Sequence, residues 1–212
     1  MRPKLVRFSE CHHVRFSAIT FKNSSCWGLS LELCNNLVID GVTVYNRAYW
    51  NNDGMDITDC KNVRITHCKV NSADDGICLK SYYPGYSDDS IYIADCTIRS
   101  GASALKFGTA SFGGFKNVTI ENIAIFDTYR SAIAIESVDG GDIENISVNN
   151  IVAKNTGNAI FIRLGQRSGD IPGGYHNPFP SSITGIPGHY VQDVVLSNIE
   201  VTYPGRVRPI LH

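Results

Sequence analysis

Three aspartates stand in two short motifs whose composition suggests a shared chemical task. Asp53 lies in Asn51-Asn-Asp-Gly-Met-Asp56, and Asp74 and Asp75 lie side by side in Ser72-Ala-Asp-Asp-Gly-Ile-Cys78. Crowded carboxylates repel each other, which raises the pKa of one of them and keeps it protonated. A protonated carboxyl that donates to a leaving oxygen, beside an ionised one that activates water or attacks the sugar, is what glycosidic bond hydrolysis requires.

Other roles for these aspartates stay open at this stage. Asp or Asn next to Gly is a common turn signal, so each motif taken alone is explained by a turn. Clustered carboxylates also suit Ca²⁺, whereas zinc-ligand spacing is absent. We expect no metal and no cofactor. The spacing of Asp53 and Asp75 along the chain favours a joint role, because it is close to one unit of a repeat.

A short motif recurs along the whole chain. Each copy is an alternating strand, often introduced by Asn or Asp, followed by a two-residue corner and a second short strand. Helical periodicity is nearly absent, so the repeat predicts an all-β fold, a parallel β-helix. The first apolar residues of the copies are Val14, Leu37, Val63, Ile91, Val118, Ile146 and Val194.

The spacing of these residues gives the size of one coil. Five of the six intervals are roughly 23–28 residues long, a period typical of solenoid repeats, and the last is nearly twice as long. We therefore expect one domain over residues 1–212 with about seven coils, and a Gly/Pro-rich insertion at about 166–190 that accounts for the long interval.

Stacked coils place residues of equal phase about 4.8 Å apart, so the seven cysteines are expected to form ladders of small buried side chains. Disulfides or metal ligation are the alternatives. One ladder contains Cys11, Cys34 and Cys60, and the other contains Cys68 and Cys96 and continues through Asn122, Asn150 and Asn198.

Composition excludes several partners. The chain has 19 Lys and Arg against 20 Asp and Glu, which argues against nucleic acid, whose binding modules carry a basic face. Apolar runs fall short of the roughly 18 residues that a membrane span needs. The N-terminus has no apolar signal-peptide core.

The sequence resembles glycoside hydrolase family 28, the polygalacturonase and rhamnogalacturonan hydrolase group. The resemblance rests on the Asn-Asn-Asp-Gly-Met-Asp motif, on Ala-Asp-Asp-Gly-Ile-Cys-Leu-Lys-Ser one coil later, and on the Asn-Val-x-Ile repeat. It covers essentially the whole chain. It implies a right-handed parallel β-helix that hydrolyses a pectic or related polysaccharide with inversion, outside the cell or in the periplasm.

The resemblance also implies roles for particular residues. By position, Asp53 matches the general acid, and Asp74 and Asp75 match the pair that activates water. Asn51 matches the Asn that opens the first motif and is expected at the substrate. Neighbouring coils lie near the roughly 5 Å carboxyl separation of retaining enzymes, so the residues alone do not choose between inversion and retention.

Two departures from the family concern the substrate. A Gly-His-Gly is expected in the next coil, where residues 100–109 contain no His. An Arg-Ile-Lys is expected one coil further, where the chain has Ala134, Ile135 and Glu136. A glutamate at this place would repel galacturonate, so either the sugar is neutral or other cations bind its acid. The candidates are Lys80, Lys106, Arg130, Arg163 and Arg167.

The length of the chain adds a further expectation. Family members are about twice as long and begin with a capping segment, and an uncovered end of a solenoid offers unpaired strand edges. We expect a fragment, a shortened natural variant or an incomplete gene product, whose ends are covered by self-association. A non-catalytic carbohydrate-binding β-helix is the second functional hypothesis, supported by the missing motifs, and a β-helix polysaccharide lyase is the third.

Overall fold

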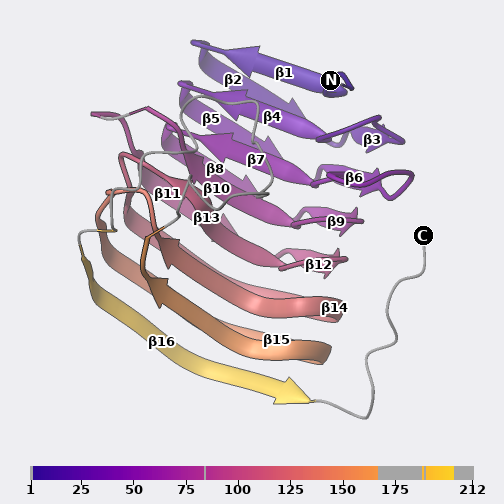
Figure 1. Ribbon diagram of the computed structural model, residues 1–212. Coiled ribbons are helices and arrows are strands. Elements are labelled where there is room, and N and C mark those ends of the chain that lie inside the picture. The colour runs from indigo at the N-terminus through magenta and orange to yellow at the C-terminus, as the bar shows by residue number, and fades with distance from the viewer. Residues whose placement is uncertain (1, 84, 167–187, 189, 203–212) are drawn as a thin grey trace, which may run out of the picture.

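In the computed structural model, the strands stack into a parallel β-solenoid, with the first coil at one end and β16 at the other (Figure 1). The structure describes residues 2–83, 85–166, 188 and 190–202. Within these residues no helix occurs, and the paired strands run parallel. The expected all-β parallel β-helix is thereby confirmed.

The strands form three stacks around a common core. The first stack contains β2 (His12–Ser17), β5 (Asn35–Asp40), β8 (Lys61–Thr66) and β11 (Asp88–Ala94). The second stack contains β3 (Thr20–Lys22), β6 (Thr43–Asn46), β9 (Lys69–Ser72) and β12 (Thr97–Ser100). The third stack contains β1 (Val6–Ser9), β4 (Leu29–Glu32), β7 (Met55–Thr58), β10 (Ile77–Ser81) and β13 (Leu105–Ser111).

In the later coils the strands continue through the corners. β14 (Phe115–Ser137) and β15 (Ile143–Leu164) each run through all three stacks, and β16 (Val191–Thr202) extends the first two. This part of the solenoid therefore has long curved strands where the earlier coils have three short ones (Figure 1).

The register of the first stack is the one that the repeat predicts. The seven aligned apolar residues pair in succession from coil to coil, namely Val14, Leu37, Val63, Ile91, Val118, Ile146 and Val194. Seven rungs are separated by about six turns, so the expected count of about seven coils is slightly too high.

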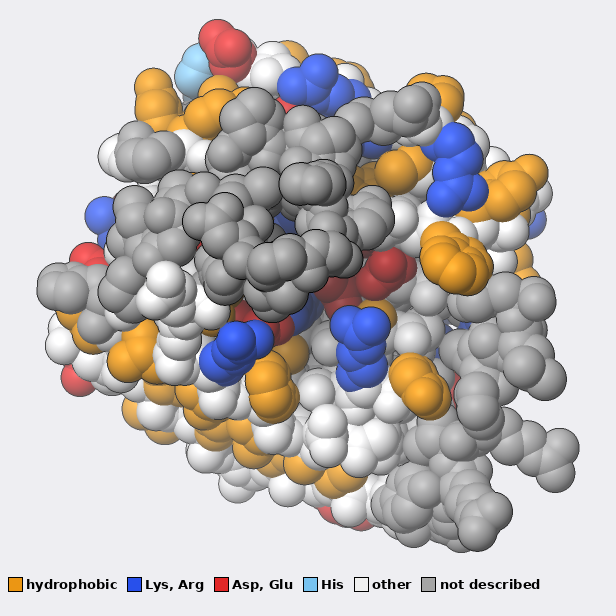
Figure 2. Space-filling model, in the orientation of Figure 1, with side chains coloured by type: hydrophobic (Ala, Val, Ile, Leu, Met, Phe, Trp, Pro, Cys, Tyr) orange, Lys and Arg blue, Asp and Glu red, His pale blue; other side chains and the backbone are white. Residues whose placement is uncertain are grey.

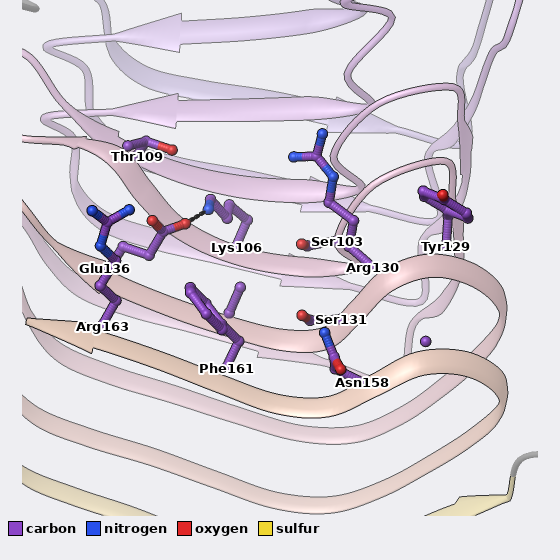
Figure 3. A pocket seen from close by; sticks show the side chains of 12 residues that line it. Ser103, Lys106, Thr109, Tyr129, Arg130, Ser131, Glu136, Asn158, Phe161 and Arg163 are labelled. Carbon is purple, nitrogen blue, oxygen red and sulfur yellow. Dashed lines mark ion pairs between the residues drawn. The ribbon is translucent and has the colours of Figure 1, made fainter. Parts of the chain in front are cut away.

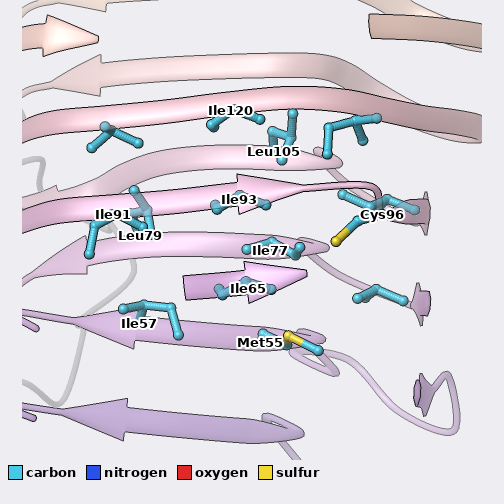
Figure 4. Close-up of a cluster of buried hydrophobic side chains, with 14 of the residues drawn as sticks. Met55, Ile57, Ile65, Ile77, Leu79, Ile91, Ile93, Cys96, Leu105 and Ile120 are labelled. Carbon is cyan, nitrogen blue, oxygen red and sulfur yellow. The ribbon is translucent and has the colours of Figure 1, made fainter. Parts of the chain in front are cut away.

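The core consists of aliphatic columns that run along the axis. In the third stack, Leu29, Met55, Ile77, Leu105 and Ile133 lie above one another and are all buried. They belong to the same buried cluster as Ile57 and Leu79, part of which Figure 4 shows. Burial of each such side chain stabilises the fold by about 1.5–3 kcal/mol, and this rigid wall positions the residues that precede β7 and β10.

Asparagines turn one corner of successive coils. Asn36, Asn62, Asn117 and Asn145 have φ angles of 59°, 54°, 54° and 54°, the left-handed region that Asn tolerates better than most residues. Their amides also bond from coil to coil, since Nδ2 of Asn145 donates to Oδ1 of Asn117 at 2.7 Å. The Asn that introduces many of the repeats is therefore a corner residue.

The first cysteine ladder lies where the repeat predicts. The amide of Cys11 lies 3.4 Å from Sγ of Cys34, and the amide of Cys34 lies 3.4 Å from Sγ of Cys60. All seven cysteines are free thiols, so the disulfide alternative is wrong for this structure.

The second ladder needs a correction of one residue. Thr97 pairs with Ala124, which places Cys96 below Ile123 rather than below Asn122. Asn122 instead follows Asp95, to which its Nδ2 donates at 3.2 Å. The asparagines continue the corner residues, because they share the left-handed conformation of Asp95.

The Gly/Pro-rich insertion expected at about 166–190 lies almost entirely outside the described residues. Beyond it the stacking resumes in register, because Ser197 donates to Asn149 across 48 residues of chain, against 28 in the preceding coil. No helix long and apolar enough to cross a membrane occurs in the part of the chain that the structure describes.

Candidate active site

Asp53 and Asp75 occupy the same position on neighbouring coils, two residues before β7 and β10 begin. The amide of Gly54 donates to the carbonyl of Asp75 at 2.9 Å, and Met55 pairs with Ile77 one step later. The register therefore brings the two aspartate motifs together, as their spacing along the chain suggests.

A glycine follows each of these aspartates because the next coil passes directly over it. A Cβ atom on Gly54 would lie 2.5 Å from the carbonyl oxygen of Gly76, and one on Gly76 would lie 2.5 Å from that of Ala104. Real Cβ atoms do not approach backbone so closely, so the Asp-Gly pairs let neighbouring coils, and with them the carboxyls, come close.

The Asp53 carboxyl is buried against a second carboxyl and a lysine. Nζ of Lys80, on the next coil, lies 3.2 Å from Oδ2 of Asp53 and 3.0 Å from Oδ1 of Asp56. Only 3% of Asp53 is exposed. Burial, followed by the charge of Asp56, raises the pKa of Asp53 well above its usual value. Asp53 is thus suited to hold a proton.

Lys80 keeps its charge in this buried place. Burial acts against the ammonium, but its neighbours, Asp56 foremost, outweigh it and raise the pKa of Lys80 well above its usual value. The cation between the Asp53 and Asp56 carboxyls is therefore supplied by the chain itself. In the described parts of the chain, no group of three or more His, Cys, Asp or Glu side chains is arranged to hold a metal ion.

Asp74 and Asp75 are only partly buried and are held from the backbone. Oδ1 of Asp75 accepts a hydrogen bond of 3.0 Å from the amide of Ser103 on the next coil. Oδ1 of Asp74 accepts one of 2.9 Å from the amide of Asp75. Burial and the neighbouring Asp75 charge raise the pKa of Asp74. The backbone donor fixes the orientation of the Asp75 carboxylate.

A groove of about 630 Å³ lies on the later coils (Figure 3), and its lining includes Ser103, whose amide donates to Asp75. In Figure 2, acidic side chains gather near the centre of the face shown, with Lys or Arg side chains next to them. The groove is lined by Ser103, Lys106, Thr109, Tyr129, Arg130, Ser131, Ala134, Glu136, Gly157, Asn158, Phe161 and Arg163. Its lining is therefore polar and basic, with two aromatic rings.

Lys106 and Glu136 form an ion pair in this groove, and both side chains are largely buried (Figure 3). Burial lowers the pKa of Lys106. Glu136 alone was expected to repel an acidic sugar. The structure offsets that repulsion, because the ammonium of Lys106 neutralises the glutamate from the preceding coil.

The other predicted substrate residues are placed differently. Arg130 and Arg163 are exposed and line the groove, whereas Lys80 is buried under Asp53 and does not line it. Asn51 is an exposed corner residue with a φ of 56°. Arg167 lies outside the described residues.

Trp27 is a site residue that the sequence analysis missed. It lies one coil before Asp53, since the amide of Gly28 donates to the Asp53 carbonyl at 3.0 Å. Nζ of Lys80 lies 4.8 Å from the centre of its ring, and Nζ of Lys4 lies 4.0 Å away on a cation–π contact. The Gly that follows it repeats the Asp-Gly pattern of the next two coils, and this signal would have revealed it.

Comparisons with known proteins show the family of the chain and support its fold. The family model described as Glycosyl hydrolases family 28 matches residues 1–207. A probable polygalacturonase of Vitis vinifera is 26% identical over 165 residues, which are 77% of this chain and 29% of that protein. Endopolygalacturonase A of Aspergillus niger is 29% identical over 161 residues, which are 71% of this chain and 41% of that protein.

Two solved structures are similar in shape. The exopolygalacturonase from Thermotoga maritima has a TM-score of 0.71 and 27% identity, with 79% of this chain and 39% of that chain covered. The family 28 exopolygalacturonase of Yersinia enterocolitica has a TM-score of 0.68 and 19% identity, with 88% and 32% covered, and supports the fold alone. The chain thus spans less than half the length of these relatives.

Proposed function

Because this chain belongs to family 28 of the glycosyl hydrolases, we propose that it hydrolyses glycosidic bonds of a pectic polysaccharide. One observation carries the proposal. The buried carboxyl of Asp53, whose pKa burial raises well above its usual value, lies one coil away from the carboxyl of Asp75, which is oriented by a backbone donor. Two carboxyls in different environments are what general acid and general base roles require.

In the proposed reaction one carboxyl gives up a proton and the other takes one up. Asp53 donates its proton to the leaving glycosidic oxygen. Asp75, assisted by Asp74, accepts a proton from the water that attacks the anomeric carbon. The two carboxyls then exchange one proton through solvent to restore the starting state. We propose that the anomeric centre is inverted, because the chain belongs to this family.

We propose that an acidic sugar binds in the groove through Arg130 and Arg163. These are the exposed guanidinium groups along its lining, and a planar guanidinium binds a carboxylate with two hydrogen bonds. Lys106 is occupied by Glu136 and supplies no free charge. The relatives are named as polygalacturonases, which supports a galacturonate-containing polymer as the substrate. We propose accordingly that the protein acts outside the cell or in the periplasm.

The test is release of reducing ends from polygalacturonan and from rhamnogalacturonan by wild type, Asp53→Asn and Asp75→Asn. We expect each substitution to lower the rate by about 10²–10⁴-fold, and the first-formed anomer, followed by NMR, to be inverted. The matched control is Asp193→Asn, an exposed aspartate on β16, which is expected to retain full activity. Equal activity of wild type and Asp75→Asn would overturn the assignment.

A binding function is the second candidate. It is favoured by the Ala134, Ile135 and Glu136 segment, which replaces the expected cations. In that case the wild type binds the polymer but releases no reducing ends, and affinity electrophoresis detects the binding.

A further inference from the structure

The contacts of Lys80 point to a role other than substrate binding. Its ammonium is buried and reaches Asp53 and Asp56 on the preceding coil, at 3.2 Å and 3.0 Å. It also lies 3.0 Å from Sγ of Cys78. Burial above all raises the pKa of the Cys78 thiol well above its usual value, so the thiol is neutral. The charges of the cluster therefore belong to one lysine and two aspartates.

The charge balance of this cluster admits one ionised carboxylate. Both aspartates are almost fully excluded from solvent, with 3% and 0% exposed. One carboxylate beside Lys80 makes a neutral ion pair, whereas a second would leave an uncompensated buried charge, which costs several kcal/mol. The cluster therefore holds one proton on its two carboxyls.

The position of the proton follows from the surrounding charges. Asp53 faces the negative charges of Asp74 and Asp75, which disfavour its ionisation. Burial raises the pKa of Asp56 as well, but Lys80, whose Nζ lies 3.0 Å from Oδ1 of Asp56, acts against this rise, as do Asp53 and Lys4. Among the described residues, Cys78 and Tyr82 also face Lys80, and the charge of Lys80 acts in turn on Lys106 of the following coil.

We propose that Lys80 and Asp56 are positioning residues that hold the catalytic proton on Asp53, because Lys80 pairs with ionised Asp56 and leaves Asp53 as the neutral carboxyl. The proposal rests on the proposed function only in that it gives Asp53 the role of proton donor. The buried pair acts on the reaction through Asp53 and without contacting substrate.

The proposal predicts opposite effects for the two residues. In Asp56→Asn, Lys80 faces Asp53 alone and draws it into the ionised form, so the alkaline limb of the kcat/KM profile moves to lower pH. In Lys80→Met, the two carboxyls share a site without a cation, so their last proton is lost at higher pH. The alkaline limb of the kcat/KM profile then moves to higher pH. Each shift is expected to be at least about one pH unit, a tenfold change in proton affinity.

Two further variants separate this mechanism from a packing role. The double variant Asp56→Asn/Lys80→Met is expected to return the limb toward the wild-type position. Asp59→Asn is the matched control, because Asp59 is a buried carboxyl with its own donors in Ser81 and the Tyr82 amide, and it is expected to leave the limb in place. Limbs that stay fixed or move in the same direction in both single variants would overturn the proposal.

A measurement without substrate separates this inference from the proposed function. The carboxyl carbon of Asp53 can be followed by NMR in protein labelled with ¹³C-aspartate, with its signal assigned from Asp53→Asn. We expect Asp53 to remain protonated at pH 7 in wild type and to be ionised there in Asp56→Asn. An ionised Asp53 in wild type would refute the proton-holding pair, whatever the activity. A protonated Asp53 in a protein without hydrolase activity would refute the function alone.

Discussion

Lys106 and Glu136 face each other across neighbouring coils as a buried ion pair in the wall of the groove (Figure 3). Glu136 stands where the family resemblance implies a lysine, and Lys106 brings the missing positive charge from the preceding coil. The two charges cancel, so the groove presents its free positive charge through Arg130 and Arg163.

We expect the effects of substituting Lys106 and Glu136 on the stability of the fold to be strongly coupled. Lys106→Met or Glu136→Gln alone leaves one buried charge without its partner and is expected to lower the free energy of unfolding by about 3–5 kcal/mol. The double variant is expected to lose much less, which urea denaturation of all four proteins will measure. The looser, more exposed pair of Lys116 and Asp89, at 3.9 Å, is the control and should couple by less than about 1 kcal/mol.

The free arginines predict a specific kinetic effect. Arg163→Gln is expected to raise KM for polygalacturonan about tenfold or more and to leave kcat nearly unchanged, because a charge-assisted hydrogen bond to the sugar is lost. Arg130→Gln should act in the same way. A methyl-esterified polymer, which lacks the charge, should show little difference. Arg64→Gln is the control, since Arg64 stacks on Tyr92 in another stack of the solenoid. An equal effect on both polymers would contradict the assignment.

Asp88 predicts a pH dependence of stability. Its Oδ1 accepts from the Cys60 amide at 2.7 Å, and its buried Oδ2 has no hydrogen-bond partner among the described residues. Burial, foremost, raises the pKa of Asp88 well above its usual value. The folded protein thus binds a proton that the unfolded chain releases near pH 4. This contribution is complete below pH 4 and is lost at about 1.4 kcal/mol per pH unit as the pH rises toward the folded pKa.

The corresponding variant is Asp88→Asn, which keeps the acceptor for Cys60 and removes the ionisation. Urea denaturation at pH 5, 6.5 and 8 should show a smaller loss of stability with rising pH than in wild type. The exposed Asp193→Asn should leave the wild-type slope unchanged. A slope that Asp88→Asn does not reduce would show that Asp88 ionises without cost.

The corner asparagines predict an order of stability. Asn117 has a φ of 54°, donates to Asp89 at 2.8 Å and accepts from Asn145 at 2.7 Å. Asn117→Ala should lower the free energy of unfolding by about 1–3 kcal/mol. Alanine is strained in the left-handed backbone conformation, and the hydrogen bonds of the Asn117 side chain are lost. Asn117→Gly loses only the hydrogen bonds and should be the more stable of the two. Thermal unfolding decides, and the reverse order would contradict this account.

The sequence predicted those features that the repeat alone determines. Alternation within each strand fixes which residues face the core, so Val63 and Ile91 could be placed on neighbouring rungs from their spacing. The same reasoning placed Asp75 one coil after Asp53. Their roles as catalytic groups stay predictions.

Features that depend on side-chain reach were not predictable. Lys80 and Asp56 meet because a long side chain crosses from one coil to the next, and spacing does not reveal that direction. The ladder from Cys96 to Asn122 was wrong by one residue, because two adjacent ladders have the same period and only the corner backbone separates them. Trp27 was missed because the equivalent position in the next two coils is occupied by an aspartate.

The backbone hydrogen bonds of this solenoid join one coil to the next, and the sequence distance between stacked residues varies widely. It is 22 residues between Asp59 and Ser81, 28 between Asn122 and Asn150, and 48 between Asn149 and Ser197. The neighbours of Ser197 are still in register with the coil before them. A corner can therefore grow or shrink in evolution without disturbing the columns on either side. The corners that line the groove can therefore change in length while the packed core stays the same, so substrate specificity can diverge while the scaffold is retained.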